Sequence, residues 1–214
     1  MPSRDRLGGS RKMEKKNIII AGVGGQGLVL ATKIIAEAAF LEGYDVKTND
    51  VVGLSQRGGM VWGTIKIGDK VLSPNIMTKD ADILLGMEPL EALRWSHNLK
   101  EGAVIIMNTK EVHPTPVLLE VLPYPNEDIE KLKDKYTVVE INARAQAKAS
   151  GNIKAANTIL IGLLSKYLKI SDETWEQVLR ENVPPKAVEE NLKAFRRGAS
   201  FQNENLEENE KSEK

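Results

Sequence analysis

The sequence predicts an α/β domain in which a mostly parallel β-sheet is flanked by helices. An apolar run at residues 17–21 leads into a glycine-rich turn and then into a helical pattern of apolar residues, as at the start of a parallel sheet. Between residues 81 and 141, short apolar runs alternate with helical patterns, which is typical of parallel strands joined by helices. Residues 143–197 carry helical patterns alone. We therefore expect one sheet followed by a helical C-terminal region.

The glycine-rich turn at residues 22–27 reads Gly-Val-Gly-Gly-Gln-Gly and is called the glycine loop below. In a Rossmann-like fold, Gly22 lets the chain turn as it leaves the strand, Gly24 leaves backbone N–H groups accessible, and Gly27 lets the helix pack on the strand. The positive start of the helix then attracts a phosphate or carboxylate. Together with Gly25 and Gln26, these residues form a candidate binding site for a nucleotide phosphate or another anion. The alternative is a tight turn that needs glycine for its geometry alone.

A second candidate ligand group follows the first helix. Apolar residues recur at helical spacing over residues 28–42, and Gly43 ends the pattern. Residues 44–48 then predict a strand that ends at Asn49-Asp50, about twenty residues after the glycine loop. A dinucleotide-binding fold places its ribose-binding acid at this distance, so Asp50 is a candidate cofactor ligand. The alternative is a solvated aspartate in a turn.

Residues 51–59 form no periodic element and contain three glycines around one arginine. Paired glycines expose backbone donors, and the planar guanidinium of Arg57 suits a phosphate or carboxylate. Ser55, Gln56, Arg57 and Gly58 are therefore candidate residues of an opposing wall for the anion site. The alternative is a flexible crossover loop with a surface arginine.

A local antiparallel hairpin is predicted inside this alternating chain. Residues 60–67 alternate as a half-buried strand, and Gly68-Asp69 is expected to turn the chain into a short strand at residues 71–72. Trp62 lies on the mixed face of the first strand. Packing or a subunit contact is the expected role for such a tryptophan, rather than a platform for a substrate.

Polar residues follow the central strands. The expected strands are residues 81–87, 103–107 and 136–141, and the expected helices are residues 89–98 and 128–133. The strands end at Glu88, Asn108-Thr109 and Asn142, and a proline-rich connection spans residues 113–125. Because open α/β sheets bind ligands at the carboxyl ends of their strands, these residues should share a rim with the glycine loop. Helix capping is the simpler role for Glu88, Thr109 and Asn142.

The C-terminal part is expected to be helical up to residue 200. Helices are predicted at residues 143–149, 155–168, 175–180 and 186–197, the third after a capping sequence at residues 171–174. We expect residues 1–16 to be an N-terminal extension, residues 17–200 a single domain, and residues 201–214 a disordered acidic tail. The length of 214 residues agrees with one core.

Composition excludes several classes of function. Thirty basic and thirty acidic residues cancel, so no overall field recruits nucleic acid or an anionic membrane. The chain has no cysteine, which excludes a thiol nucleophile and an iron–sulfur cluster carried by this polypeptide. With two histidines in unlike contexts, a histidine metal site or a Ser/His/Asp triad is not expected. No stretch approaches the roughly 18 to 20 apolar residues of a membrane helix, and a cytoplasmic location is expected.

The order of these motifs resembles a known family. The glycine loop is followed by Asp50, by Gly53-Leu54-Ser55-Gln56-Arg57-Gly58-Gly59, by Ser73-Pro74, by Ala81-Asp82-Ile83-Leu84-Leu85 and by Glu88-Pro89-Leu90-Glu91-Ala92. Gly151-Asn152 and Ala156-Asn157 precede the helical close. Over residues 17–197 the chain is similar to the gamma-type subunits of the 2-oxoacid:ferredoxin oxidoreductases, most of all to those of the indolepyruvate enzymes.

The resemblance implies a Rossmann-like gamma domain that works within a complex. It implies a larger partner subunit holding thiamine diphosphate and iron–sulfur clusters, oxidative decarboxylation of a 2-oxoacid to an acyl-CoA, and ferredoxin as electron acceptor. This chain would hold no cofactor alone and would be inactive in isolation, with self-association of the isolated chain left open. Gln26 and Arg57 would then help to close a composite active site or contact the phosphates of CoA.

Two further functions remain open at this point. The glycine loop and Asp50 also fit a stand-alone NAD(P)-dependent oxidoreductase, and the scarcity of general acids and bases fits a nucleotide-binding regulatory module. The chain departs from similar family members at Val52, where they carry a histidine. Valine provides no imidazole for a hydrogen bond or proton transfer at this position. The substrate is therefore either indolepyruvate or another 2-oxoacid whose side chain would pack against an apolar surface.

Overall fold

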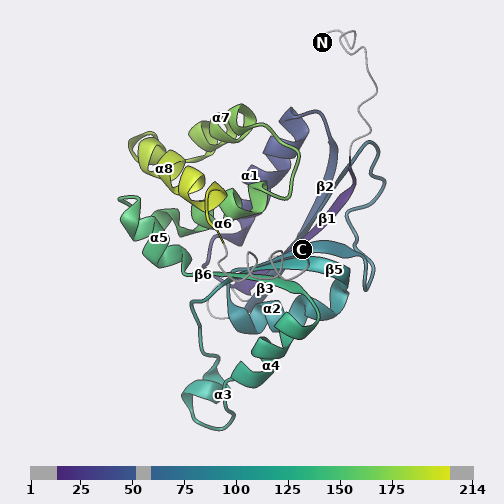
Figure 1. Cartoon of the computed structure of the whole chain (residues 1–214), viewed down its shortest axis with the longest axis vertical. Helices are drawn as coiled ribbons and strands as arrows, with labels where there is room; N and C mark the ends of the chain where they lie inside the picture. The colour runs from purple at the N-terminus through teal and green to yellow at the C-terminus, as the bar shows by residue number, and fades with distance from the viewer. Residues whose placement is uncertain (1–13, 52–58, 203–214) are drawn as a thin grey trace, which may run out of the picture.

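The computed structural model describes residues 14–51 and 59–202, which build a six-stranded sheet between two layers of helices (Figure 1). The strands are β1 (Lys16–Val23), β2 (Asp45–Val51), β3 (Met60–Gly68), β4 (Ala81–Gly86), β5 (Leu99–Asn108) and β6 (Thr137–Ile141). The helices are α1 (Leu28–Leu41), α2 (Pro89–Trp95), α3 (Thr115–Leu118), α4 (Asn126–Glu130), α5 (Ala143–Ala149), α6 (Ala156–Ser165), α7 (Asp172–Asn182) and α8 (Val188–Ala199). Short 3-10 turns are η1 (Ser96–Asn98), η2 (Lys131–Asp134), η3 (Ile153–Ala155) and η4 (Pro185–Ala187).

The strand order is β2-β3-β1-β4-β5-β6. Parallel pairing joins β1 to β4, β4 to β5, and β5 to β6. The exception is β3, which runs antiparallel to both of its neighbours, β1 and β2. The predicted fold class, a mostly parallel sheet with an antiparallel hairpin and helices on its faces, is confirmed.

The antiparallel hairpin lies elsewhere than predicted. Residues 71–72 are not a strand, and β3 pairs with the preceding strand β2 instead. The reason is that β1 and β2 already occupy both edges of β3, so no backbone groups remain for a third partner. The segment after β3 folds back over it, where the Thr64 hydroxyl donates to the Pro74 carbonyl at 3.0 Å and the Val71 N–H donates to the Asp45 carboxylate at 2.7 Å.

Both faces of the sheet are buried, each under its own group of helices. In β1, Ile18 and Ile20 face a core shared with α1, α6, α7 and α8, whereas Ile19 faces a second core below α2 and α4. Figure 1 shows α1 and α5 to α8 on one side of the sheet and α2 and α4 on the other. Trp62 packs against Trp95 of α2, with ring centroids 4.5 Å apart, which agrees with the packing role expected for it.

The first core is closed by an unusually tight contact between α6 and α8. A Cβ atom on Gly162 would collide with the carbonyl oxygen of Phe195, and one on Gly198 would collide with that of Ile159. The two helix backbones therefore touch, and side-chain-free positions are required on both. This contact fixes α6, whose first turn reaches the carboxyl edge of the sheet.

The predicted C-terminal helices are present with small shifts at their ends. Residues 143–149 form α5 as predicted, and Ser171 caps α7 by accepting a hydrogen bond from the Thr174 N–H at 3.4 Å. The helix predicted at residues 155–168 is shorter, because α6 ends at Ser165. None of the helices in the described part of the chain is long and apolar enough to cross a membrane.

Candidate functional site

A cavity of about 280 Å³ opens where β1, β4 and β5 end, and we call it the carboxyl-edge cavity. Its polar lining consists of Gln26, Asn108, Lys110, Arg144 and Asn157, and its apolar lining of Met87, Ile153 and Ala156. The carboxyl edge is the position at which open α/β sheets bind ligands. The glycine loop, the end of β5 and the first turns of α5 and α6 meet here, so the expectation that strand-end residues share a rim with the glycine loop is confirmed for Asn108, which lines the cavity together with Gln26.

The side chain of Gln26 folds back over its own loop. Its Oε1 accepts a hydrogen bond from the Val23 N–H at 2.7 Å, and its Nε2 donates to the Met87 carbonyl at 3.3 Å. A Cβ atom on Gly22 would lie 2.6 Å from the Gln26 Oε1, so glycine at this position makes room for the amide. Gln26 therefore joins the glycine loop to the chain after β4 and presents its edge to the cavity.

Two asparagines fix the walls of the carboxyl-edge cavity. The Asn157 Nδ2 donates to the backbone carbonyl of Gln26 at 2.7 Å and to that of Gly27 at 3.4 Å. Asn108 lies at the end of β5, where its Nδ2 donates to the Met87 carbonyl at 3.1 Å and its Oδ1 accepts from the Ala143 N–H at 3.2 Å. The position of the cavity is thus set by side chains that tie neighbouring strand ends together.

The backbone of the glycine loop is partly bonded within the protein. The Gly24 N–H donates to the Gly59 carbonyl at 2.8 Å, and the Gln26 N–H donates to the Val23 carbonyl at 3.1 Å. Gly25 and Gly27 have φ angles of 94° and 77°, in the region that favours glycine. Backbone conformation therefore accounts for glycine at positions 25 and 27, as space for the Gln26 amide does at position 22, and the Gly24 N–H is bonded within the protein.

Two cations stand at the mouth of the cavity. Lys110 follows β5 by two residues, and Arg144 lies in the first turn of α5. Both side chains are exposed, and neither pairs with a carboxylate in the described part of the chain. A pair of uncompensated cations beside three amide side chains is suited to bind an anionic group by charge and by hydrogen bonds.

The other predicted cofactor residues are not brought to this cavity by the described structure. Asp50 lies within β2, where it pairs with Gly63, rather than in a turn after a strand. Because β3 is inserted between β1 and β2, this position is two strands away from the glycine loop, whereas a dinucleotide-binding fold has it on the neighbouring strand. The structure thus gives no support to the stand-alone NAD(P) enzyme. Ser55, Gln56, Arg57 and Gly58 lie outside the described residues.

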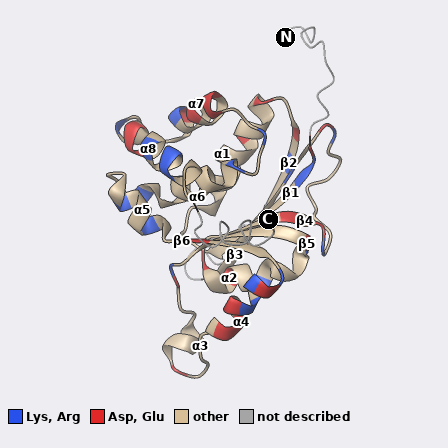
Figure 2. Ribbon diagram, viewed as in Figure 1, with Lys and Arg blue, Asp and Glu red and all other residues tan. Residues whose placement is uncertain are grey.

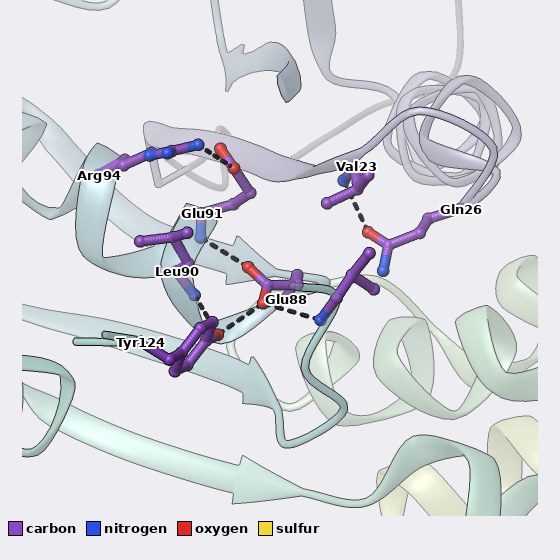
Figure 3. A network of polar contacts seen from close by, with 8 residues as sticks. Val23, Gln26, Glu88, Leu90, Glu91, Arg94 and Tyr124 are labelled. Carbon is purple, nitrogen blue, oxygen red and sulfur yellow. Dashed lines mark hydrogen bonds and ion pairs between the residues drawn. The ribbon is translucent and has the colours of Figure 1, made fainter. Parts of the chain in front are cut away.

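Glu88, after β4, occupies a fully buried position. Its Oε2 accepts from the Glu91 N–H at 3.0 Å and thereby caps α2, as the simpler interpretation predicts. Its Oε1 accepts from the Tyr124 hydroxyl at 2.6 Å and from the Val112 N–H at 3.1 Å (Figure 3). Burial and the neighbouring Glu88 raise the pKa of the Tyr124 hydroxyl well above its ordinary value, so it remains a donor.

Capping also accounts for Asn142 but not for Thr109. The Asn142 side chain accepts from the Ala145 N–H at 2.9 Å at the start of α5. Thr109 continues the β5 ladder through its backbone, with its N–H donating to the Ile141 carbonyl at 3.1 Å, and its side chain is exposed.

Lys110 and Arg144 were missed at the level of sequence. The sequence feature that could have identified them is their position, because each lies two residues after a polar residue at a strand end, Asn108 or Asn142. Among the described residues, no group of three or more His, Cys, Asp or Glu side chains is placed to hold a metal ion. The arrangement defines an α/β domain with a cavity at the carboxyl edge of its sheet that is lined by two cations and three amide side chains.

Comparison with known proteins identifies the class. Residues 17–201 match the family model described as pyruvate ferredoxin/flavodoxin oxidoreductase. The chain is 36% identical over 200 residues to the indolepyruvate oxidoreductase subunit IorB of Pyrococcus horikoshii, covering 91% of this chain and 99% of that protein. It is 30% identical to the pyruvate/ketoisovalerate oxidoreductases common subunit gamma of Thermococcus litoralis, covering 82% and 90% of the two chains.

A solved structure agrees with this result. The keto/oxoacid ferredoxin oxidoreductase gamma subunit of Geobacter sulfurreducens is 29% identical, with a TM-score of 0.63 over 86% of this chain and 95% of that chain. The chain belongs to the pyruvate ferredoxin/flavodoxin oxidoreductase family. Within that family it is an oxidoreductase subunit of the gamma type.

Proposed function

We propose that this subunit completes the active site of a larger partner subunit that oxidatively decarboxylates a 2-oxoacid to an acyl-CoA. Indolepyruvate or another aryl 2-oxoacid is the proposed substrate, and the support is the 36% identity to an indolepyruvate oxidoreductase subunit. The proposed electron acceptor is ferredoxin, in the cytoplasm. Val52, which replaces a histidine of similar proteins, lies outside the described residues and keeps other 2-oxoacids with apolar side chains within the proposal.

The redox cofactors are assigned to the partner. Iron–sulfur clusters are held by cysteine thiolates, and this chain contains no cysteine, so the residues present do not fit a cluster. We therefore propose that the clusters lie on the partner subunit, and that thiamine diphosphate is bound there with them. What this chain contributes is the binding and orientation of an anionic group.

The carboxyl-edge cavity is the proposed contact with CoA. Lys110 and Arg144 supply positive charge, while Gln26, Asn108 and Asn157 supply amide groups held in fixed positions by backbone partners. A phosphate group of CoA is the ligand that this lining suits best. The glycine-loop residues Gly22, Gly24, Gly25, Gln26 and Gly27 would form its floor, and residues 55–58 are the proposed opposing wall. The single observation that carries the proposal is the pair of unpaired cations at the carboxyl edge.

The proposal is tested with Arg144→Ala in the reconstituted complex of this chain and its partner. Because the lost cation would contact CoA alone, the KM for CoA should rise by about 10-fold, while the KM for the 2-oxoacid stays unchanged. Lys148→Ala is the matched control, because Lys148 lies one helical turn further along α5 and does not line the cavity. Equal effects of the two substitutions, or a raised KM for the 2-oxoacid alone, would contradict the assignment of the cavity to CoA.

A further inference from the structure

Residues 113–123, which we call the leucine arm, include α3 and project from the body of the domain (Figure 1). Four large apolar side chains on the arm are exposed: Leu118 by 67%, Leu119 by 68%, Val121 by 70% and Leu122 by 57%. Glu120 is the one charged residue between positions 114 and 125, and the arm is almost free of charge in Figure 2, whereas charges cover α4, α7 and α8. Monomeric proteins rarely expose such a patch without a function for it.

The backbone of the arm closes on itself. The N–H groups of Leu118 and Leu119 donate to the carbonyls of Pro114 and Thr115, at 3.0 Å and 2.9 Å. Glu120 then takes a left-handed φ of 57°, which turns the chain so that the next N–H donates to the Pro116 carbonyl at 2.9 Å. A non-glycine residue in this conformation is strained, and the turn around it holds the leucine side chains outward.

One buried carboxyl group holds both ends of the arm. The Glu88 Oε1 accepts from the N–H of Val112, just before the arm, and from the hydroxyl of Tyr124, just after it (Figure 3). The Tyr124 hydroxyl also accepts from the Leu90 N–H at 3.1 Å, and its ring lies 5.0 Å from that of His113. The arm is therefore anchored at its base to the end of β4 and the start of α2. An apolar loop anchored in this way is preorganised for binding.

We propose that the leucine arm docks into an apolar groove of the partner oxidoreductase subunit. The four side chains expose on the order of 500 Å², which is less than the roughly 800 Å² that each partner buries in a stable interface. Contact through two arms alone is therefore too small for a stable dimer of this chain, and the interface must continue onto neighbouring surface. The base of the arm adjoins the carboxyl-edge cavity, since Lys110 lines that cavity and precedes Val112 by two residues.

Docking on the arm would thus bring the partner over the carboxyl-edge cavity. The inference rests on the proposed function and adds to it the surface by which the partner is held. It differs from that function in its residues, because the arm contributes apolar contact and the cavity contributes charge. The two can be tested separately.

The test uses the full chain and the thiamine-bearing subunit that copurifies with it from native cells. Binding is measured by calorimetry for the wild type and for the double variant Leu118→Asp/Leu122→Asp. Because charges would enter the centre of an apolar contact, the Kd should rise by about 100-fold or more. Circular dichroism and the Tm should stay close to the wild type, since both side chains are exposed.

Phe40→Asp is the matched control, because Phe40 is 70% exposed on α1 and lies outside the arm. If Phe40→Asp weakens binding as much as the double variant does, the leucine arm is not the docking site. Wild-type affinity of the double variant would also overturn it while leaving the proposed function intact. If the isolated chain forms oligomers that the double variant abolishes, the groove belongs to a second copy and the proposal is wrong. Failure to recover any thiamine-bearing partner would instead overturn the proposed function, and the docking with it.

Discussion

Two strand-to-helix turns lie side by side at the carboxyl edge, and only one of them has a side chain that caps its helix. The parallel strands β1 and β4 each lead into a helix whose first N–H groups need partners. After β4, the buried Glu88 caps α2 with its own side chain. After β1, α1 begins at Leu28, and its N-cap residue Gly27 offers no side-chain cap; the first turn of α1 carries no acidic residue.

The two turns differ in which group faces the start of each helix. At α2 an internal carboxyl group already occupies the position that a bound phosphate or carboxylate would take. At α1 no side chain of the described residues caps the helix and no acidic residue lies in its first turn, and the cations Lys110 and Arg144 line the adjoining cavity. The turn into α2 is capped by the chain's own Glu88, whereas the turn into α1 has no side-chain cap among the described residues.

The largest expected effect on stability comes from weakening the support of the turn between β1 and α1. Gly162→Ala places a Cβ against the carbonyl of Phe195, so α6 must move away from α8. We expect a loss of about 3 kcal/mol in the free energy of unfolding, measured by chemical denaturation. Because Asn157 of α6 holds the glycine loop, hydrogen exchange there should accelerate more than at the start of α2. Gly68→Ala is the control, since the atoms nearest to its Cβ lie at an ordinary 3.7 Å; equal losses in both variants would show that the tight helix contact is not the cause.

A smaller loss of stability is expected at the turn between β4 and α2. Tyr124→Phe removes the hydroxyl that donates to Glu88 and accepts from the Leu90 N–H. A loss of about 1–3 kcal/mol in the free energy of unfolding is expected, because buried polar groups lose a partner. Tyr136→Phe is the matched control, since that hydroxyl makes one longer bond, of 3.2 Å, to the Ser96 carbonyl. A Tyr124→Phe variant as stable as the control would show that the turn between β4 and α2 does not depend on the hydrogen bonds of the Tyr124 hydroxyl.

The smallest effect concerns pH. Burial raises the pKa of the Glu91 carboxyl, while its 2.6 Å ion pair with Arg94 opposes the rise. The folded state therefore holds the proton more tightly than the unfolded state, and the resulting stability is complete below the ordinary pKa and is lost as pH rises through the raised value. In thermal unfolding, the Tm of the Glu91→Gln variant should rise relative to the Tm of the wild type as the pH increases from about 4 to about 7. A difference in Tm that is constant over this range would contradict the raised pKa.

Much of the fold was predictable because local patterns agree with it. The apolar run before the glycine loop, the helix that follows and the strands at residues 81–87 and 136–141 are set by periodicity and turn residues, and the structure confirms them. The hairpin was placed wrongly because pairing is a long-range property. Nothing local tells β3 to insert between β1 and β2 rather than to pair with the residues after it.

The site was predictable in part for the same reason. Gln26 and Asn108 follow strand ends, and the common edge of a parallel sheet brings them together. Asp50 carried the expected spacing, but the strand order moves its position away from the glycine loop. Lys110 and Arg144 have no motif of their own, and their importance comes from the cavity that three separate segments enclose.

The contact between α6 and α8 also has a consequence for synthesis of the chain. Leu192 and Phe195 of α8 are almost fully buried in the first core, and the α6 and α8 backbones touch at Gly162 and Gly198. That core stays open on the ribosome until residues near 199 have emerged. The apolar face of α6 is meanwhile accessible to chaperones, and a nascent chain stopped before α8 would be a target for proteolysis rather than for assembly.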